Sequence, residues 1–171
     1  MGRLPDGNRK VCEDFFETPR SSIEPVLKYI PAHVKTVWEP THGGGAITNV
    51  LRERGYRVIA SDLYPKTDGC ARLDFLTDEP DEPWDMLVFN PPFCLKHAFM
   101  KRALSFGKPV LFIAPMNILE SQARFEIWRE KRLSLIILRR RTQYTEQGQC
   151  TFHSAWVISD GQGRLYWEDN A

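Results

Sequence analysis

The sequence predicts a doubly wound α/β fold, with a largely parallel sheet that carries helices on both faces. Short apolar segments alternate along the chain with segments whose apolar residues recur at helical spacing. A glycine-rich loop joins the first expected strand to a helix, and Asp62 ends the second expected strand. The 171 residues are 42% hydrophobic, which is enough for one domain with its own core.

The first half of the chain predicts two helices and two strands. Ser21 and Glu24 form a capping box that starts a short helix through Tyr29, and Pro31 ends this helix. The next expected elements are a strand at 36–38, a helix at 46–54 closed by Gly55, and a strand at 56–60.

The second half completes the sheet and adds a hairpin. Its expected elements are strands near 71–73, at 86–89 and at 110–114, and helices at 96–106 and 118–129. The segments 133–138 and 151–158 are also strand-like, and they form an antiparallel hairpin around the polar stretch 139–149. Residues 1–12 are expected to be a flexible arm, and residues 13–171 a single domain.

Composition narrows the kinds of partner. The net charge is +1, from 23 basic and 22 acidic side chains, so a nucleic acid must be held by a local basic patch. The four cysteines and four histidines are scattered, which argues against a metal site. No apolar run reaches the roughly 20 residues that span a bilayer, and the N-terminus lacks an apolar signal. We therefore expect a cytoplasmic protein with free thiols and no membrane contact.

The loop 39–45, Glu-Pro-Thr-His-Gly-Gly-Gly, has the composition of a ligand-binding turn. Glycines let the backbone approach a ligand closely and adopt positive φ, although many folds use such a loop only to turn a strand into a helix. Asp62 follows Glu39 by 23 positions (62 − 39), near the roughly 20-residue spacing at which an acid meets a ribose hydroxyl. Glu39 is an acceptor that suits a cationic ligand better than a phosphate. Sequence alone favours a structural turn role for His42.

The segment 90–93, Asn-Pro-Pro-Phe, ends the apolar run 86–89. Prolines cannot continue the hydrogen-bond ladder, so this polar segment is expected at the carboxyl end of a buried strand, where open α/β sheets bind ligands. Asn and Pro are also ordinary residues of a strand-ending turn. Cys94 beside it has no nearby base and is expected to act as a small apolar residue.

Asn-Pro-Pro-Phe resembles the catalytic motif of S-adenosylmethionine-dependent methyltransferases that modify the N6 amine of adenine in DNA. The segment 16–19, Phe-Glu-Thr-Pro, is similar to a cofactor-contacting segment of amino methyltransferases, and its place ahead of the glycine loop resembles the gamma class. The resemblance implies a Rossmann-like seven-stranded methyltransferase sheet, mostly parallel with a C-terminal antiparallel hairpin. It also implies S-adenosylmethionine as the cofactor.

The resemblance assigns roles to individual residues. Asn90 and the carbonyl of Pro91 accept hydrogen bonds from the target amine, and Phe93 stacks on the base. The catalytic set is Asn90, Pro91, Pro92 and Phe93. The cofactor set is Phe16, Thr18, Pro19, Glu39, Pro40, Gly43, Gly45, Asp62, Leu63, Asp74, Phe75 and Asn90. In this set Asp62 holds the ribose and Asp74 with Phe75 the adenine, unless Asp74 is only a solvated turn acid.

A basic region after the catalytic segment is a candidate nucleic-acid surface. It comprises Lys131, Arg132 and Arg139–Arg141, with Tyr144 and Phe152 as aromatic surface and Lys96, Lys101 and Arg102 as another flank. An ordinary solvated hairpin would have the same composition.

The chain lacks room for the target-recognition region that sequence-specific enzymes of this resemblance usually carry. It therefore recognises little sequence, uses the loop 140–150, or relies on a specificity partner. Three other acceptors fit the same motif, namely RNA, guanine N2 and a protein glutamine. A non-catalytic methyltransferase-like subunit that binds nucleic acid is a further alternative.

Overall fold

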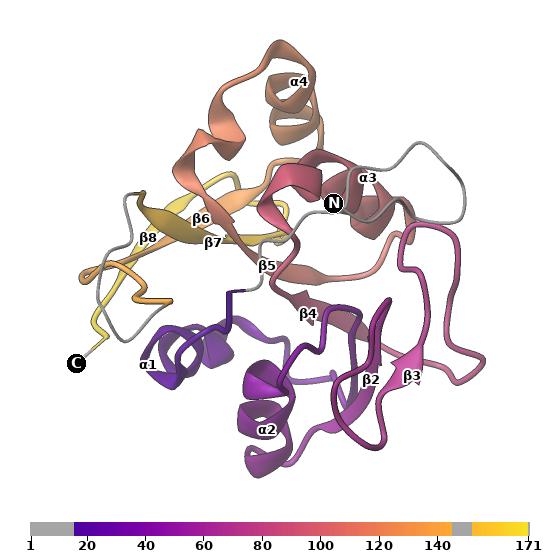
Figure 1. The fold of residues 1–171 in the computed structure, drawn as a ribbon. Helices are drawn as coiled ribbons and strands as arrows, with labels where there is room; N and C mark the ends of the chain where they lie inside the picture. The colour runs from indigo at the N-terminus through magenta and orange to yellow at the C-terminus, as the bar shows by residue number, and fades with distance from the viewer. Residues whose placement is uncertain (1–15, 145–151, 171) are drawn as a thin grey trace.

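The computed structural model describes residues 16–144 and 152–170, so the expected arm 1–12 lies outside the described residues. In the described part, eight strands form one sheet in the order β3-β2-β1-β4-β5-β7-β6-β8 (Figure 1). The strands are β1 (Thr36–Glu39), β2 (Arg57–Asp62), β3 (Ala71–Arg72), β4 (Met86–Phe89), β5 (Val110–Pro115), β6 (Ser134–Leu138), β7 (Ser154–Ile158) and β8 (Leu165–Glu168). Strand β7 is antiparallel to β5 and β6, and the other described pairs are parallel.

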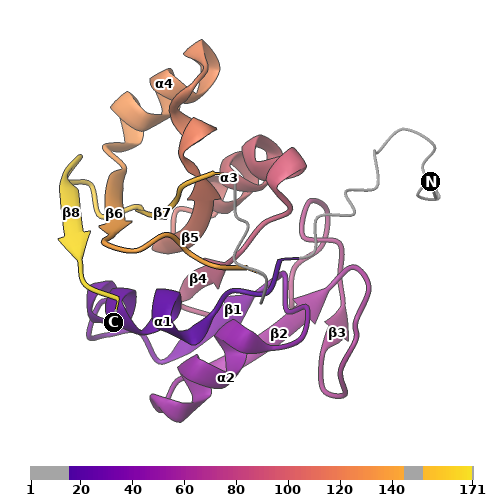
Figure 2. The same ribbon diagram turned by 60° about the vertical axis from the view of Figure 1, so that its left-hand side comes forward.

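Helices cover both faces of this sheet (Figures 1 and 2). One face carries α1 (Arg20–Ile23), the 3-10 helix η1 (Glu24–Tyr29) and α2 (Ala46–Glu53). The other carries α3 (Lys96–Ser105), η3 (Met116–Leu119) and α4 (Gln122–Lys131). The 3-10 helix η2 (Phe93–Leu95) follows β4, and its Phe93 packs into the core on the α1 and α2 face. The predicted doubly wound α/β class, with a mostly parallel sheet and an antiparallel C-terminal hairpin, is confirmed.

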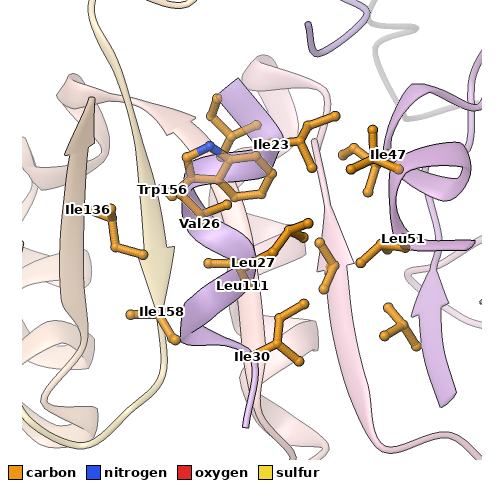
Figure 3. Packing of buried hydrophobic residues seen from close by; sticks show 14 of the residues in the cluster. Ile23, Val26, Leu27, Ile30, Ile47, Leu51, Leu111, Ile136, Trp156 and Ile158 are labelled. Atoms are coloured by element: carbon orange, nitrogen blue, oxygen red, sulfur yellow. The ribbon is translucent and has the colours of Figure 1, made fainter. Parts of the chain in front are cut away.

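Alternate residues of the central strands pack into two separate cores. In β4, Met86 and Val88 face α1 and α2, whereas Leu87 and Phe89 face α3. All four are fully buried, as expected for a strand covered on both faces. Figure 3 shows Ile23, Val26 and Leu27 lying over the sheet beside Trp156, whose indole nitrogen donates to the Ser22 carbonyl at 2.8 Å.

Two predictions about helix starts are wrong. Pro19, not Ser21, is the N-cap of α1, and Ser21 lies inside the helix. Glu24 accepts hydrogen bonds from the side chains of Arg20 and Arg54 instead of completing a capping box. The helix expected at 118–129 is divided, because η3 ends at Leu119 and Ser121 starts α4 by accepting a hydrogen bond from the Arg124 amide.

The sheet has one more strand than the seven predicted. Strand β8 pairs in parallel with β6 and forms an edge of the sheet. Leu165 and Trp167 are exposed there, and Tyr166 and Glu168 are half-buried. The segment therefore lacks the alternation of apolar and polar residues that marks a strand in the sequence.

Strand direction decides which loops meet. β1, β2, β4, β5 and β6 run parallel to one another, so their carboxyl ends share one edge of the sheet. The glycine loop, Asp62, Asn90 and the segment after Leu138 all start there. Lys131 and Arg132 precede β6 and lie toward the opposite edge, so the expectation of a single basic region is wrong.

No helix in the described ranges is long and apolar enough to cross a membrane.

Candidate active site at the carboxyl edge of the sheet

The side chain of Asn90 is held in one orientation at the tip of β4. Its amide nitrogen donates to the Phe16 carbonyl at 2.7 Å and to the Thr18 hydroxyl oxygen at 3.0 Å. A carbonyl oxygen only accepts, so the amide nitrogen must face the segment 16–19. The side-chain oxygen of Asn90 is buried and has no hydrogen-bond partner within the described residues. Native proteins rarely leave a buried acceptor unpaired, so this oxygen is available to a donor from a ligand.

The ring of Phe93 lies in an aromatic cluster formed by residues far apart in the sequence. It stacks on Phe16, with centroids 5.6 Å apart and planes 25° apart. Tyr144 and Phe152 meet it edge-on at 5.8 and 5.4 Å. Phe93 is 7% exposed and Tyr144 is 9% exposed. The expectation of an aromatic surface is therefore wrong for Tyr144, which is buried, whereas Phe152 is half-buried and packs on Phe93.

Hydrogen bonds join the glycine loop to the tips of β2 and β4. The backbone amide of Asn90 donates to the Thr41 hydroxyl oxygen at 3.2 Å, and the backbone amide of Gly43 donates to Asp62 Oδ2 at 2.9 Å. Asp62 Oδ1 accepts from the Tyr64 amide at 2.9 Å. Each carboxylate oxygen can accept a further bond. Asp62 therefore fixes the loop and keeps acceptor capacity for a ligand.

Glu39 belongs to a closed polar network. Its carboxylate is 1% exposed and accepts a hydrogen bond from the Thr48 hydroxyl. His42 Nδ1 lies 2.9 Å from the Thr48 hydroxyl oxygen, and His42 Nε2 lies 2.8 Å from that of Thr67. Burial raises the pKa of Glu39, because a charged carboxylate is poorly solvated there. The network joins the glycine loop to the chain between β2 and β3.

Asp74 and Phe75 lie in a turn after β3. Asp74 Oδ1 accepts from the Leu76 amide at 3.0 Å, an arrangement typical of a turn acid. The ring of Phe75 is 2% exposed and stacks on Phe99 at 5.0 Å. The ring therefore contributes to the core, and a role of this turn in holding adenine stays a prediction.

The segment 16–19 also packs on the glycine loop, through Glu17. A Cβ atom built on Gly44 would lie 2.1 Å from Glu17 Oε1, so a side chain at position 44 would displace this carboxylate. Sequence reasoning missed Glu17, Thr41 and the contact of Thr18 with Asn90. These contacts join residues more than 20 positions apart, so no local pattern could reveal them.

The cysteines differ from one another. Cys94, next to Phe93, is disulfide-bonded, so the expectation of free thiols is wrong at this position. Cys70 is free, and burial raises the pKa of its thiol to about 11. Within the described ranges, no group of three or more His, Cys, Asp or Glu side chains could hold a metal ion.

Comparison with known proteins identifies the fold. No family model and no curated protein matches the chain. A putative RNA methyltransferase from Pyrococcus horikoshii has a TM-score of 0.64 at 15% identity, with 88% of each chain covered. The 23S rRNA methyltransferase ErmE has a TM-score of 0.63 at 16% identity, with 85% of this chain and 68% of that chain covered. The chain has a methyltransferase fold.

A third similar structure is the methyltransferase subunit of a type I restriction-modification system from Streptococcus thermophilus. Its TM-score is 0.62 at 14% identity, and the match covers 90% of this chain. This chain spans 47% of the length of that subunit. At such low identity the likeness establishes the arrangement of strands and helices, and the acceptor must be argued from the site.

Proposed function

We propose that this methyltransferase fold transfers a methyl group from S-adenosylmethionine to the N6 amine of adenine in DNA. The observation that carries the proposal is the buried side-chain oxygen of Asn90, which Phe16 and Thr18 orient and which no described residue hydrogen-bonds. An amine that donates to this oxygen would satisfy it. The type I subunit supports DNA as the acceptor, since it is a methyltransferase of a restriction-modification system with the same fold.

The residues around Asn90 suit an aromatic amine. The lone pair of the adenine amine is delocalised into the ring, which makes the nitrogen a poor nucleophile. Two acceptors, Asn90 Oδ1 and the Pro91 carbonyl, would bind its two hydrogens and favour a nitrogen whose lone pair points out of the ring plane. When the nitrogen forms its new bond to the methyl carbon, the bond from that carbon to the cofactor sulfur would break and leave a neutral thioether, and the nitrogen would release one proton to water. Rate acceleration then comes mainly from orientation and electrostatic placement.

The residues at the neighbouring strand tips fit a cationic nucleoside ligand. The loop 39–45 contains no Lys or Arg, while the carboxylates of Glu17 and Asp62 lie against it. A pyrophosphate would meet negative charge there, whereas an ammonium or sulfonium group would be attracted. We assign the methionine part of S-adenosylmethionine to the loop, the ribose to Asp62 and Leu63, and the adenine to the turn at Asp74. Once bound, the cofactor supplies a methyl group on a positively charged sulfur.

Base stacking requires a local movement of the aromatic cluster. Phe93 is 7% exposed, so a target base can stack on it only if a neighbouring ring leaves. Phe16 has a plane 25° from that of Phe93 and is therefore oriented as a stacked base would be. In a duplex the target must also leave the helix, which costs a few kcal/mol.

RNA is the second candidate acceptor, because two of the similar structures are RNA methyltransferases. Incubation with labelled cofactor and separate DNA, RNA and protein pools, followed by nucleoside and amino-acid analysis, separates the alternatives. We expect label in N6-methyldeoxyadenosine. Label in guanosine, in adenosine from RNA or in glutamine would reassign the acceptor. Calorimetry with the cofactor tests the non-catalytic alternative, in which no binding is measured.

An Asn90→Ala variant is the matched control in these incubations. It should bind the cofactor with nearly unchanged affinity and transfer at least about 100-fold more slowly, as when an enzyme loses one preorganised hydrogen-bonding group at the reacting atoms. Transfer at the wild-type rate would refute the role of Asn90.

A further inference from the structure

A cavity of about 570 Å³ lies beside the site, between the segment 16–21 and the chain that follows β6. Its walls include Thr18, Ser21, Arg140, Arg141, Gln143 and Tyr144. The Thr18 hydroxyl accepts a hydrogen bond from the side-chain amide of Asn90, and Tyr144 contacts the Phe93 ring edge-on. The cavity therefore shares two wall residues with the contacts of the catalytic segment.

The wall that carries the arginines is fixed by buried hydrogen bonds. Asn170 is 6% exposed, and its side chain accepts from the Arg140 amide at 2.8 Å and donates to the Arg140 carbonyl at 3.0 Å. Thr142 is 2% exposed and accepts from the Ser22 hydroxyl at 3.0 Å. These bonds hold the backbone on both sides of Arg141. The side chains of Arg140, Arg141 and Gln143 stay exposed on the anchored wall.

The charge of these two arginines is not neutralised inside the described protein. Neither Arg140 nor Arg141 makes an ion pair with a described residue, and Arg141 Nε contacts His153 Nε2 at 2.6 Å. The other cations nearby are paired, Arg20 with Glu24 and Glu53, and Arg139 with Asp169. Glu17 also lines the cavity, but its carboxylate lies against Gly44 of the glycine loop. Arg140 and Arg141 thus provide a positive wall that no described carboxylate neutralises.

We propose that this cavity binds the phosphodiester backbone of the substrate strand next to the target base. The inference rests on the proposed function and adds to it the place where the strand lies. A guanidinium offers several donors in a fixed plane and pairs well with phosphate oxygens. Gln143 on the same wall and Ser21 on the facing one supply further polar groups. Such contacts fix the position of a strand without reading its sequence.

The test uses an Arg140→Ala/Arg141→Ala double variant, with Arg139→Ala as the matched control. Arg139 is adjacent and exposed, but it pairs with Asp169 and does not line the cavity. Binding of fluorescent single-stranded DNA and RNA oligonucleotides of equal sequence is measured at several salt concentrations. Loss of two phosphate contacts should weaken binding at least about tenfold and reduce the logarithmic salt slope by about 1.4. The control should keep the wild-type slope and affinity, and the DNA and RNA arms show which strand the wall accepts.

Cofactor calorimetry and thermal melting of the double variant must match the wild type, which shows that the fold and the cofactor site are intact. A double variant with the wild-type slope and the wild-type KM for the oligonucleotide would overturn the inference. Methyl transfer to adenine by the wild type would leave the proposed function standing in that case. Conversely, a wild-type protein that binds strands through these arginines but transfers no methyl group would overturn the proposed function alone.

Discussion

The amide nitrogen of Asn90 donates to the hydroxyl oxygen of Thr18 at 3.0 Å, across 72 positions of sequence. The contact joins the tip of β4 to the segment that leads into α1. With the bond to the Phe16 carbonyl, it directs the side-chain oxygen of Asn90 away from both partners. The family resemblance assigns Thr18 to the cofactor, and these bonds add a role for Thr18 in positioning Asn90.

Replacing Thr18 by Val should lower kcat about tenfold with little change in the KM for the cofactor. The valine keeps the shape of the buried side chain but removes one acceptor, at a cost of about 1–3 kcal/mol for an unsatisfied buried group. Thr18→Ser restores the oxygen and should recover most of the rate. If Thr18 serves only the cofactor, Thr18→Val will instead raise the KM for S-adenosylmethionine and leave kcat unchanged.

Asp62 should control cofactor affinity in a graded way. Its two oxygens hold the Gly43 and Tyr64 amides, and a charged acceptor contributes about 1.5–3 kcal/mol per hydrogen bond. We expect Asp62→Asn to weaken cofactor binding by calorimetry about tenfold, and Asp62→Ala to weaken it further. Equal affinity in wild type and Asp62→Ala would remove Asp62 from the site.

Gly45→Ala should destabilise the protein and also weaken cofactor binding. Gly45 has φ of +93°, and a Cβ there would lie 3.1 Å from His42 Cε1. A left-handed backbone costs a non-glycine residue about 1–2 kcal/mol. Gly55→Ala is a matched control, since Gly55 has φ of +87° and nothing within 4 Å of a Cβ. Urea unfolding should show a loss in both variants, whereas calorimetry should show weaker cofactor binding only in Gly45→Ala.

Glu39 should make the folded protein less stable as pH rises. Its pKa is raised in the fold from 4.5, chiefly by burial, so the folded state binds this proton more tightly than the unfolded state. The resulting stabilisation is complete below pH 4.5 and is lost as pH rises through the raised pKa. A Glu39→Gln variant lacks this titration. Its free energy of unfolding relative to wild type should increase between pH 4.5 and neutral pH, and a constant difference would contradict the assignment.

Much of the fold can be predicted from the sequence because its signals are local. The run 86–89 is apolar at every position, as a strand buried on both faces requires, and it forms β4 as predicted. The glycine loop and Asp62 meet as expected, and the Gly43 amide contacts the Asp62 carboxylate. Asn90, Asp62 and the loop share one edge because parallel strands end together.

The remaining features depend on the path of the chain in space. The arginines on either side of β6 are separated by the length of a strand, although they are close in sequence. Phe75 follows an acid in a turn, yet its ring fills the core beneath Trp38 and Phe99, which a local pattern does not show. The cover over Phe93 comes from residues 16, 144 and 152, whose meeting depends on the position of β7 in the sheet.

Strand β7 follows both β5 and β6 in the sequence, yet it lies between them inside the sheet. During translation the edge of β5 has no partner until residues 154–158 leave the ribosome. An open edge of this kind can pair with other chains. Phe152, which packs edge-on against Phe93, lies two residues before β7, so this contact also cannot form until that part of the chain is made. A nascent chain stalled before this point would contain the glycine loop and Asn90, but Phe93 would lack the edge-on cover of Phe152.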